Sequence, residues 1–336
     1  MTANVPQNMI DTSEKPDKMN ASIDICKLLM AVLVVGIHTR IFGFSHALQG
    51  GYFFLTRLCV PFFFMASAYF FYLKQHSLLK YIKRIGLLYL AWFFIFLPCN
   101  IKSYTVMGMP KFLSQIFFVG AGQGTWYLVA SIWGIVILEV LLKFFKPKVV
   151  FAISCACFIF GCFSITWSNS VFYEALRGGV FPNPIGHYNA PYRALAFMAA
   201  GMLLAKSKNK GKQMNLKTMI IGFIVSLMFM TVEYVIEVFF LKSHDTHMNL
   251  FHLPAMFFFF CIWNNIDIQL DKEKSLLFRK MSILLYLSHR LFLGLMKPYF
   301  DNFILFIVVL AEALLFSYSV VRLSGYKHLK CLKWLY

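Results

Sequence analysis

The sequence predicts an all-α integral membrane protein with about ten transmembrane helices and both termini on the cytoplasmic side. The composition supports this class, because 60% of the 336 residues are hydrophobic and only 14% are charged. Soluble domains are about half apolar and about a quarter charged. The apolar residues also form runs of about twenty, the length that a helix needs to cross a bilayer. These observations exclude an ordinary soluble protein.

A window of about nineteen residues, the length of one spanning helix, predicts where each helix lies. The predicted spans are 22–43, 52–73, 84–101, 126–144, 148–166, 191–206, 217–241, 248–265, 281–297 and 302–323. Helices are expected because each can satisfy its own backbone hydrogen bonds in lipid. The sixth and ninth spans are the shortest in apolar length and contain charged residues.

Lysine and arginine positions predict the orientation, since cytoplasmic loops carry an excess of both. With the N-terminus inside, 22 of the 32 Lys and Arg residues fall in inside segments, six fall outside and four lie within spans. The excess recurs loop by loop, which favours ten crossings of the plasma membrane. It also explains most of the net charge of +18 without a nucleic-acid partner.

The chain divides into three predicted regions. Residues 1–21 form a cytoplasmic tail, 22–325 form one transmembrane domain, and 326–336 form a basic cytoplasmic tail that we interpret as the start of a linker to a further domain. The eight cysteines include no CxxC pair, and most of them are expected to be buried as small apolar residues. The histidines lack the spacing of a metal site, and the sequence has no Gly-rich nucleotide motif, so neither a metal nor a tightly bound cofactor is expected.

Ionisable residues inside a span are energetically costly, so they are functional candidates. The first span contains Asp24, Lys27 and His38. Lys27 and His38 are eleven residues apart, which places them on one helix face and about 16 Å apart along the axis. This arrangement suits an anionic cytoplasmic substrate that reaches a histidine in the outer half of the membrane. Alternatively, Asp24 and Lys27 extend to the inner interface, and His38 is a hydrogen-bonded interior residue.

Other predicted spans carry further charges at matching depths. Arg57 and Arg193 lie near the outer ends of the second and sixth spans, where they either hold an anionic group or extend to outside water. His289 and Arg290 lie near mid-membrane in the ninth span, which indicates a polar interior. The seventh span carries two acids on one helix face, Glu233 and Glu237. These acids either pair with the arginines or face outside water.

Six stretches in order resemble the motifs of membrane acyltransferase family 3. They are Lys27-x10-His38 with Asp24 before it, Arg57 followed by VPFFFMASAYFF at 60–71, the basic pair Lys83-Arg84, Gly124-Thr125-Trp126-Tyr127-Leu128, the stretch from Tyr192-Arg193 to Gly201, and Tyr286-Leu287-Ser288-His289. The resemblance covers roughly residues 20–325, and the family's usual count of ten helices is the same. The sequence departs from the family at Lys27, where Arg is commoner, at Gly124, where His is common, and at Ala68, where Gly is usual.

The resemblance implies transfer of an acyl group, usually acetyl from acyl-CoA, to a hydroxyl of a cell-envelope or small-molecule acceptor. His38 would be the catalytic general base and Lys27 part of the donor path. We expect donor or acceptor binding from the remaining charged and aromatic motif residues: Arg57, Arg193, Trp126, Tyr286, His289 and Arg290. The basic cytoplasmic surface of Lys80, Lys83 and Arg84 would attract the CoA phosphates.

One branch of this family is the membrane half of VanT-type serine racemases, and residues 60–71 resemble that branch especially. This suggests a second hypothesis, in which the membrane domain binds or transports serine for a fused or associated cytoplasmic enzyme. Glu233 or Glu237 would then face the amine and an arginine the carboxylate. A third hypothesis is a structural membrane anchor, which gives no reason for the charged residues within the spans.

Overall fold

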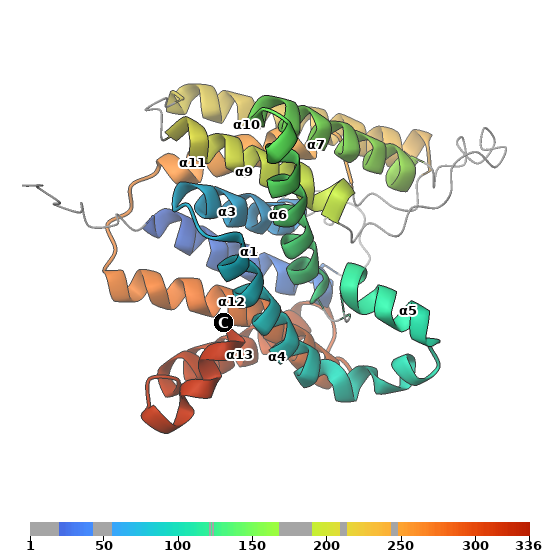
Figure 1. The fold of residues 1–336 in the computed structure, drawn as a ribbon. Helices are drawn as coiled ribbons and strands as arrows, with labels where there is room; N and C mark the ends of the chain where they lie inside the picture. Colours follow the sequence, from blue (N-terminus) through green and yellow to red (C-terminus); the bar gives the residue numbers. More distant parts are fainter. Residues whose placement is uncertain are drawn as a thin grey trace, which may run out of the picture.

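The computed structural model describes residues 20–42, 56–120, 122, 124–167, 190–208, 214–242 and 248–336 (Figure 1). Within these ranges all regular structure is helical, which confirms the predicted all-α class. Residues 1–19 of the predicted N-terminal tail and residues 168–189 of the predicted outside connection lie outside the described residues.

Eleven α-helices follow one another along the described residues. They are α1 (Ala21–Thr39), α3 (Cys59–Leu73), α4 (Leu78–Thr105), α5 (Met109–Ser114), α6 (Trp126–Phe144), α7 (Pro147–Cys162), α9 (Leu195–Lys208), α10 (Leu216–Val235), α11 (His252–Asn265), α12 (Lys272–Met296) and α13 (Asn302–Leu323), with π-helical turns at Gln115–Val119, Phe163–Trp167, Ala190–Ala194 and Ile236–Phe240 and a 3-10 segment at Lys327–Leu335. Each of the ten predicted spans overlaps one of these helices, and α5 is an additional short helix.

Among the described residues, five stretches are long and apolar enough to cross a membrane. They are Ala21–Thr39, Leu78–Thr105, Trp126–Phe144, Leu216–Phe240 and Asn302–Leu323, and α3 and α7 are shorter apolar helices. The transmembrane class is therefore supported, whereas ten crossings and the cytoplasmic position of the termini stay predictions. Helix α4 also begins six residues before the predicted third span, so the basic residues predicted to precede that span lie in its first turns.

The relative directions of packed helices agree with alternating crossings. Helix α1 runs parallel to α12, because Asp24 near the start of α1 meets Arg279 and His38 near its end meets His289. These are the first and ninth predicted spans, which must share a direction. Helices α3 and α9, the second and sixth, are likewise parallel. They approach closely at Gly201, where an added Cβ would collide with the carbonyl oxygen of Met65.

The seventh and eighth predicted spans, α10 and α11, pack antiparallel, as alternation also requires. The ring of Phe229 stacks on Phe251 across α10 and α11, while Phe223 lies against Phe259 at the other end of the same pair. The outermost helix, α10, leaves a row of apolar side chains exposed on its free side, including Ile220, Ile221, Ile224 and Met228. Such an apolar surface suits contact with lipid.

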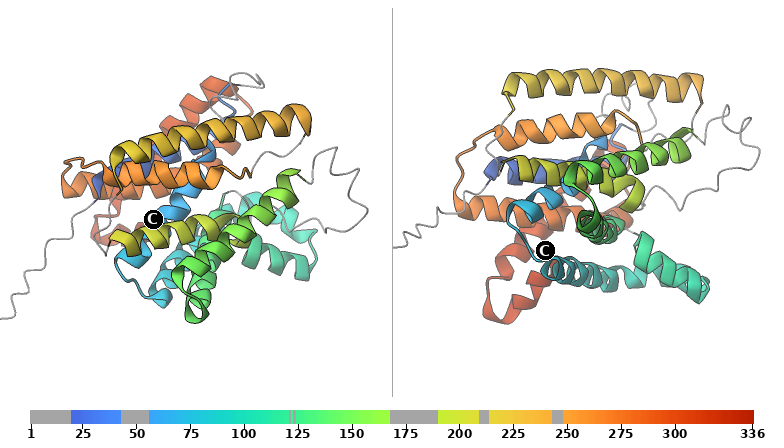
Figure 2. Two further views of the ribbon diagram at one scale, coloured as in Figure 1. Left: turned by 90° about the horizontal axis from the view of Figure 1, so that it is seen from above. Right: turned by 45° about the horizontal axis from the view of Figure 1, so that its top comes forward.

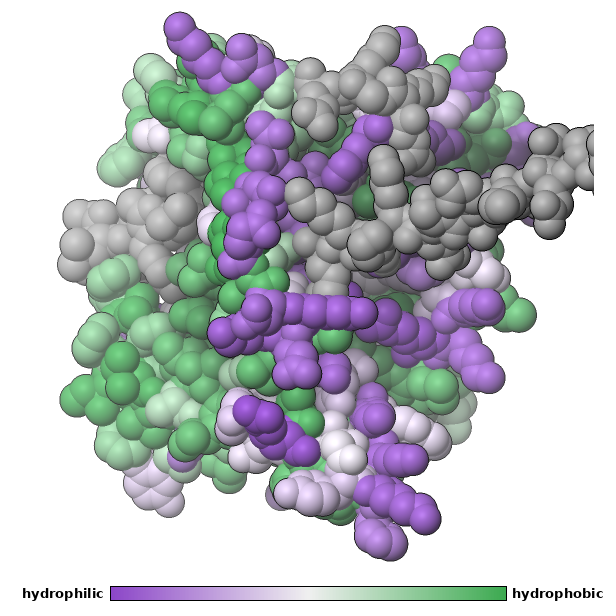
Figure 3. Space-filling model, turned by 90° about the vertical axis from the view of Figure 1, so that its left-hand side faces the viewer, coloured by the Kyte–Doolittle hydropathy of each residue, from purple (hydrophilic) through white to green (hydrophobic). Residues whose placement is uncertain are grey.

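The buried core is aromatic and lies between α3, α4, α6, α9 and α11. Its largest fully buried side chains include Trp92, Tyr69, Phe62, Phe64 and Phe260. Hydrophilic side chains gather instead on the face where α1 and α12 begin and where α3 and α11 end, which Figure 3 shows from the left of Figure 1. This is the end predicted to be cytoplasmic.

Candidate functional site

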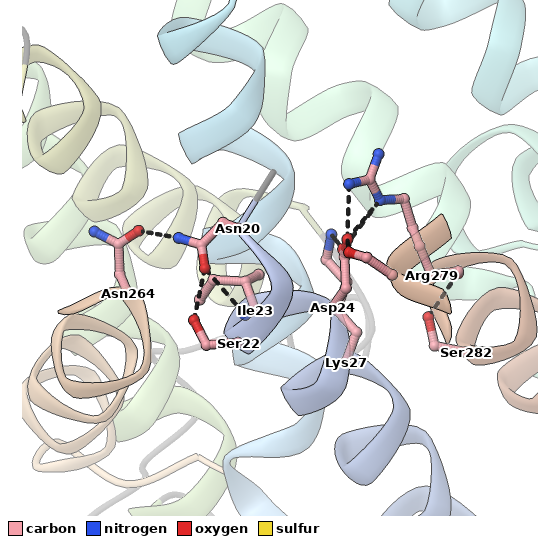
Figure 4. A network of polar contacts seen from close by, with 9 residues as sticks. Asn20, Ser22, Ile23, Asp24, Lys27, Asn264, Arg279 and Ser282 are labelled. Carbon is pink, nitrogen blue, oxygen red and sulfur yellow. Dashed lines mark hydrogen bonds and ion pairs between the residues drawn. The ribbon is translucent and has the colours of Figure 1, made fainter. Parts of the chain in front are cut away.

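A buried carboxylate joins the first turns of α1 and α12. Asp24 is 0% exposed and accepts two hydrogen bonds from the Arg279 guanidinium at Oδ2, from Nη2 at 2.7 Å and from Nε at 3.2 Å, with a third from Nε to Oδ1 at 3.0 Å. The hydroxyl of Ser275 donates to the same carboxylate at 2.8 Å. Lys27, one turn further along α1, lies 3.4 Å from Oδ1 (Figure 4). One acid thus holds two cations at the same end of the helix pair.

The same network fixes the neighbouring helix ends. The side chain of Asn20 caps α1 by accepting from the backbone N–H of Ile23, and its amide donates to Asn264 near the end of α11 at 2.8 Å. Ser22 donates to the side chain of Asn20 and to the carbonyl of Trp263. Figure 4 shows these contacts beside the Asp24 network. The N-terminus of α1 is therefore held by hydrogen bonds to two other helices.

Lys27 forms part of the wall of a pocket of about 240 Å³. Its ammonium group also lies 4.8 Å from the ring centre of Phe70, which lines the same pocket. Among the described residues, the lining of this pocket includes no acidic residue, as expected of a site for an anion. Its Lys and Arg residues are Lys27, Lys74, Arg84 and Arg279. Of the three basic residues predicted to attract the CoA phosphates, Arg84 lines this pocket. Lys80 and Lys83 do not line it and are exposed on the same helix.

The other end of this pocket is aromatic. Phe63, Tyr127 and Tyr286 line it and pack edge to face against one another, with ring centres 5.5 to 5.9 Å apart. Tyr286 in turn lies 6.2 Å, centre to centre, from the imidazole of His289. A layer of rings therefore lies between the cationic pocket and His289.

His38 and His289 form a stacked pair. Their ring centres are 5.2 Å apart and their planes differ by 14°. The guanidinium of Arg290 lies 3.4 Å from Nε2 of His38. Because arginine can only donate, Nε2 is the acceptor in this contact and carries no proton. The structure therefore brings together three residues that sequence patterns had placed in two different spans.

The backbone determines the tautomer of His289. Its Nδ1 lies 2.7 Å from the carbonyl oxygen of Tyr286, so Nδ1 carries the proton and donates it, which leaves the Nε2 lone pair available. His289 is 1% exposed, and within the described part of the chain its Nε2 has no hydrogen-bond partner. The pair thus has two unprotonated Nε2 atoms, of which that of His38 accepts from Arg290 and that of His289 has its lone pair unused among the described residues.

The segment before α6 lies against Tyr286. The hydroxyl of Tyr286 donates to the carbonyl of Gly124 at 3.2 Å. Gly124 has a φ of +89°, a left-handed conformation that favours glycine. Two residues later the ring of Trp126 lies 5.5 Å from the buried guanidinium of Arg193, a cation–π contact. Trp126 and Arg193 are therefore neighbours, on the far side of this segment from Tyr286.

The remaining predicted residues belong to a second buried polar cluster. The carbonyl of Arg57, in the turn before α3, contacts Nε2 of the buried His252. Glu233 accepts hydrogen bonds from the backbone N–H groups of Leu250 and Phe251 at 2.6 and 3.0 Å, so it caps the start of α11. Glu237 is fully buried and accepts from the side-chain amide of Asn249 at 2.6 Å. Both acids are buried, so the alternative in which they face outside water is wrong.

The sequence indicated the residues of α1 but missed several of their partners. Arg279 and Ser275 lie in a polar, basic stretch that hydropathy assigns to a cytoplasmic loop, and His252 and Asn249 lie at the edge of an apolar run. One signal was present, because Arg279 precedes Arg290 by the same eleven residues that separate Lys27 from His38. Two equal spacings fit two parallel helices that contact each other at both ends.

The fold and site define a polytopic helical membrane protein with a pocket lined by basic side chains at one end of its helix bundle and a histidine pair beyond it. The acyltransferase domain family, acyltransferase 3, matches residues 20–322 of this chain. The chain belongs to this family. The family resemblance expected from the sequence motifs is thus confirmed.

Three curated relatives from enterococci are similar to the chain. An amino-acid racemase of Enterococcus faecalis is 25% identical over 91% of this chain and 47% of its own length. Another amino-acid racemase of that organism is 29% identical over 58% of this chain and 29% of its own. A serine/alanine racemase of Enterococcus gallinarum is 27% identical over 71% of this chain and 36% of its own. The chain thus spans less than half the length of these relatives, and no solved structure matches it.

Proposed function

We propose that the chain is a plasma-membrane O-acyltransferase that moves an acyl group, most simply acetyl, from cytoplasmic acyl-CoA to the hydroxyl of an envelope or small-molecule acceptor. The observation that carries this proposal is the placement of a cationic pocket and an imidazole pair at successive depths of the same two parallel helices. A CoA thioester has the matching form, with phosphates at one end and a reactive carbonyl at the other.

In this mechanism the donor enters from the cytoplasmic end. Its phosphates bind near Arg84 and Lys74, and Lys27 is positioned by Asp24 at the pocket wall. The pantetheine arm then lies along the rings of Phe63 and Tyr127 towards the histidines. The donor needs no metal for this chemistry, and it acts as a substrate rather than as a resident cofactor.

The transfer step uses His38 as general base. Its Nε2 takes the proton of the acceptor hydroxyl as the oxygen attacks the thioester carbonyl. Arg290, 3.4 Å from that nitrogen, shifts its hydrogen bond from Nε2 to the developing oxyanion, which frees the lone pair for the proton and stabilises the tetrahedral intermediate. The tetrahedral intermediate then breaks its carbon–sulfur bond. The CoA thiolate leaves with the proton that His38 returns, which gives the ester and free CoA.

The test is acyl transfer by the purified chain in lipid nanodiscs. Labelled acetyl-CoA is supplied with a panel of hydroxyl acceptors, including serine and envelope saccharides, and both labelled product and free CoA are measured. We expect His38→Ala to lower transfer by at least about a hundredfold. His328→Ala is the matched control, since His328 is exposed on the C-terminal 3-10 segment. Full activity of His38→Ala, or no binding of acetyl-CoA by the wild type, would disprove the mechanism.

A second candidate function is a serine-binding or serine-transport domain that serves a cytoplasmic racemase, and the names of the curated relatives favour it. The buried cluster of Glu237, Asn249, His252 and Arg193 offers groups of both signs for a zwitterion. Saturable binding of labelled L-serine that Glu237→Gln abolishes, in a chain that does not bind acetyl-CoA, would favour this function over acyl transfer.

A further inference from the structure

A second and larger hollow lies away from the histidines, between α7, α9, α10 and α11. It has a volume of about 640 Å³, within the range of ligand pockets. Its lining is mainly apolar and includes Phe151, Leu203, Met219 and Phe258. In the view from above in Figure 2, α10 and α11 lie on one side and α7 and α9 on the other, and the residues that line the groove come from these four helices and from Met214 just before α10.

The groove borders the surface that suits lipid. Its outer wall is α10, which contributes Met219 to the groove and leaves Ile220, Ile221 and Ile224 exposed on its free side. Helix α10, with the π turn that follows it, is the second most hydropathic of the five predicted crossing stretches. An apolar groove that opens beside such a helix is accessible to the acyl chains of the bilayer.

One end of the groove is polar. Ser207 and Lys208 at the end of α9 line it together with Asn264 and Asn265 at the end of α11. Asn264 accepts a hydrogen bond from Asn20, just before α1, so the polar end of the groove lies at the same face of the molecule as the Asp24 network. That face is predicted to be cytoplasmic, and residues 206–217, which connect α9 to α10, carry five lysines.

We propose that this groove binds a membrane phospholipid with a net negative headgroup. Its acyl chain lies on Leu203, Met219 and Phe258, and its phosphate accepts hydrogen bonds from the Lys208 ammonium and the Asn265 amide. Basic pockets between membrane helices at the cytoplasmic side recognise anionic headgroups in this way. The groove extends along α9 from Ala200 to Lys208, and the eight helical steps between these two residues span about 12 Å. The proposal does not depend on which reaction the chain performs.

The test is photocrosslinking of the purified full chain in detergent. The probe is phosphatidylglycerol with a diazirine in its acyl chain, and the matched probe is phosphatidylcholine with the same chain. We expect the phosphatidylglycerol probe to label peptides of α9, α10 and α11, and unlabelled phosphatidylglycerol to compete at least fivefold better than phosphatidylcholine. Equal labelling by both probes, or labelling of other helices, would overturn the proposal without any variant.

Variants then assign the headgroup. Lys208→Glu should lower labelling of the groove by at least fivefold, whereas Lys206→Glu should leave it unchanged, because Lys208 lines the groove and Lys206 does not. The two ammonium groups are otherwise alike, since each lies over a tyrosine ring, Lys208 over Tyr69 and Lys206 over Tyr72. Both variants reverse the same charge within one turn of α9, so a general effect of surface charge would affect them equally. Unchanged labelling of Lys208→Glu, or an equal loss in both variants, would refute the headgroup contact.

Discussion

The imidazoles of His38 and His289 stack at 5.2 Å although 251 positions separate the two residues in the sequence. The contact exists because α1 and α12 run parallel and bring their outer turns to the same depth. It places Nε2 of His38 beside Arg290 and keeps the Nε2 lone pair of His289 available, because the carbonyl of Tyr286 holds the proton on Nδ1. The two histidines therefore have different neighbours, and their replacement should have different effects.

Replacement of His38 should affect the rate rather than donor binding. His38→Ala is expected to lower kcat by about 10²- to 10⁴-fold, while the KM for acetyl-CoA stays within about twofold, because His38 is not among the residues that line the cationic pocket. Steady-state kinetics at several donor concentrations measures both constants. A raised KM with unchanged kcat would contradict the role of a base. A greater loss of kcat in His289→Ala than in His38→Ala would assign that role to His289.

Loss of the cationic pocket wall should weaken donor binding. Arg84→Ala is expected to raise the Kd for acetyl-CoA by about threefold to tenfold, because a charge-assisted contact with a phosphate is removed. The affinity of the wild type should fall as salt increases, and the variant should depend less on salt. Lys102→Ala, an exposed lysine at the opposite end of α4, is the control and should bind as the wild type does. Equal affinities of all three chains would exclude this pocket as the donor site.

The carboxylate that holds two cations should matter for stability. Asp24→Asn is expected to lower the free energy of unfolding by about 3 kcal/mol, because Arg279 and Lys27 then share no buried negative charge. The same substitution at Asp271, which pairs with Lys274 on the exposed surface, should change it by less than about 1 kcal/mol. Thermal unfolding in detergent compares the two variants. Similar unfolding temperatures would show that the Asp24 network adds little.

The close approach of α3 and α9 should not tolerate a larger side chain. Gly201→Ala places a Cβ against the backbone of Met65, which cannot move as a flexible side chain would, and should destabilise the fold by about 1–3 kcal/mol. Gly294→Ala in α12 meets nothing within 4 Å and should be neutral or stabilising by up to about 1 kcal/mol. The unfolding temperatures of the two variants should therefore change in opposite directions, and a common direction would contradict the packing.

The predicted crossings can be tested by cysteine labelling in cells. Lys111→Cys in α5 should react with a membrane-impermeant maleimide in intact cells, because this segment is predicted to be outside. A chain that retains only Cys331, which is exposed in the 3-10 segment, should react only after the membrane is permeabilised. The two positions flank seven predicted spans, an odd number. Labelling of both from the same side would show that the count of spans between them is wrong.

The sequence alone predicts the class and the positions of the helices because both depend on local properties. The length and hydropathy of each apolar run are enough to place a helix there, and all ten predicted intervals overlap one. The Lys27 to His38 spacing is also local, since one helix fixes the face and depth of both residues. The family motifs are contiguous stretches for the same reason.

Only the tertiary structure decides which charges meet. Hydropathy places Arg279 in a loop, yet it is a main partner of Asp24, because the fold brings a polar first turn of α12 against α1. Glu233 could equally have paired with an arginine or faced water, but it caps α11, whose first N–H groups have no partner within the helix. Such choices depend on contacts between residues far apart in the chain, and a one-dimensional pattern of polarity contains no distances between helices.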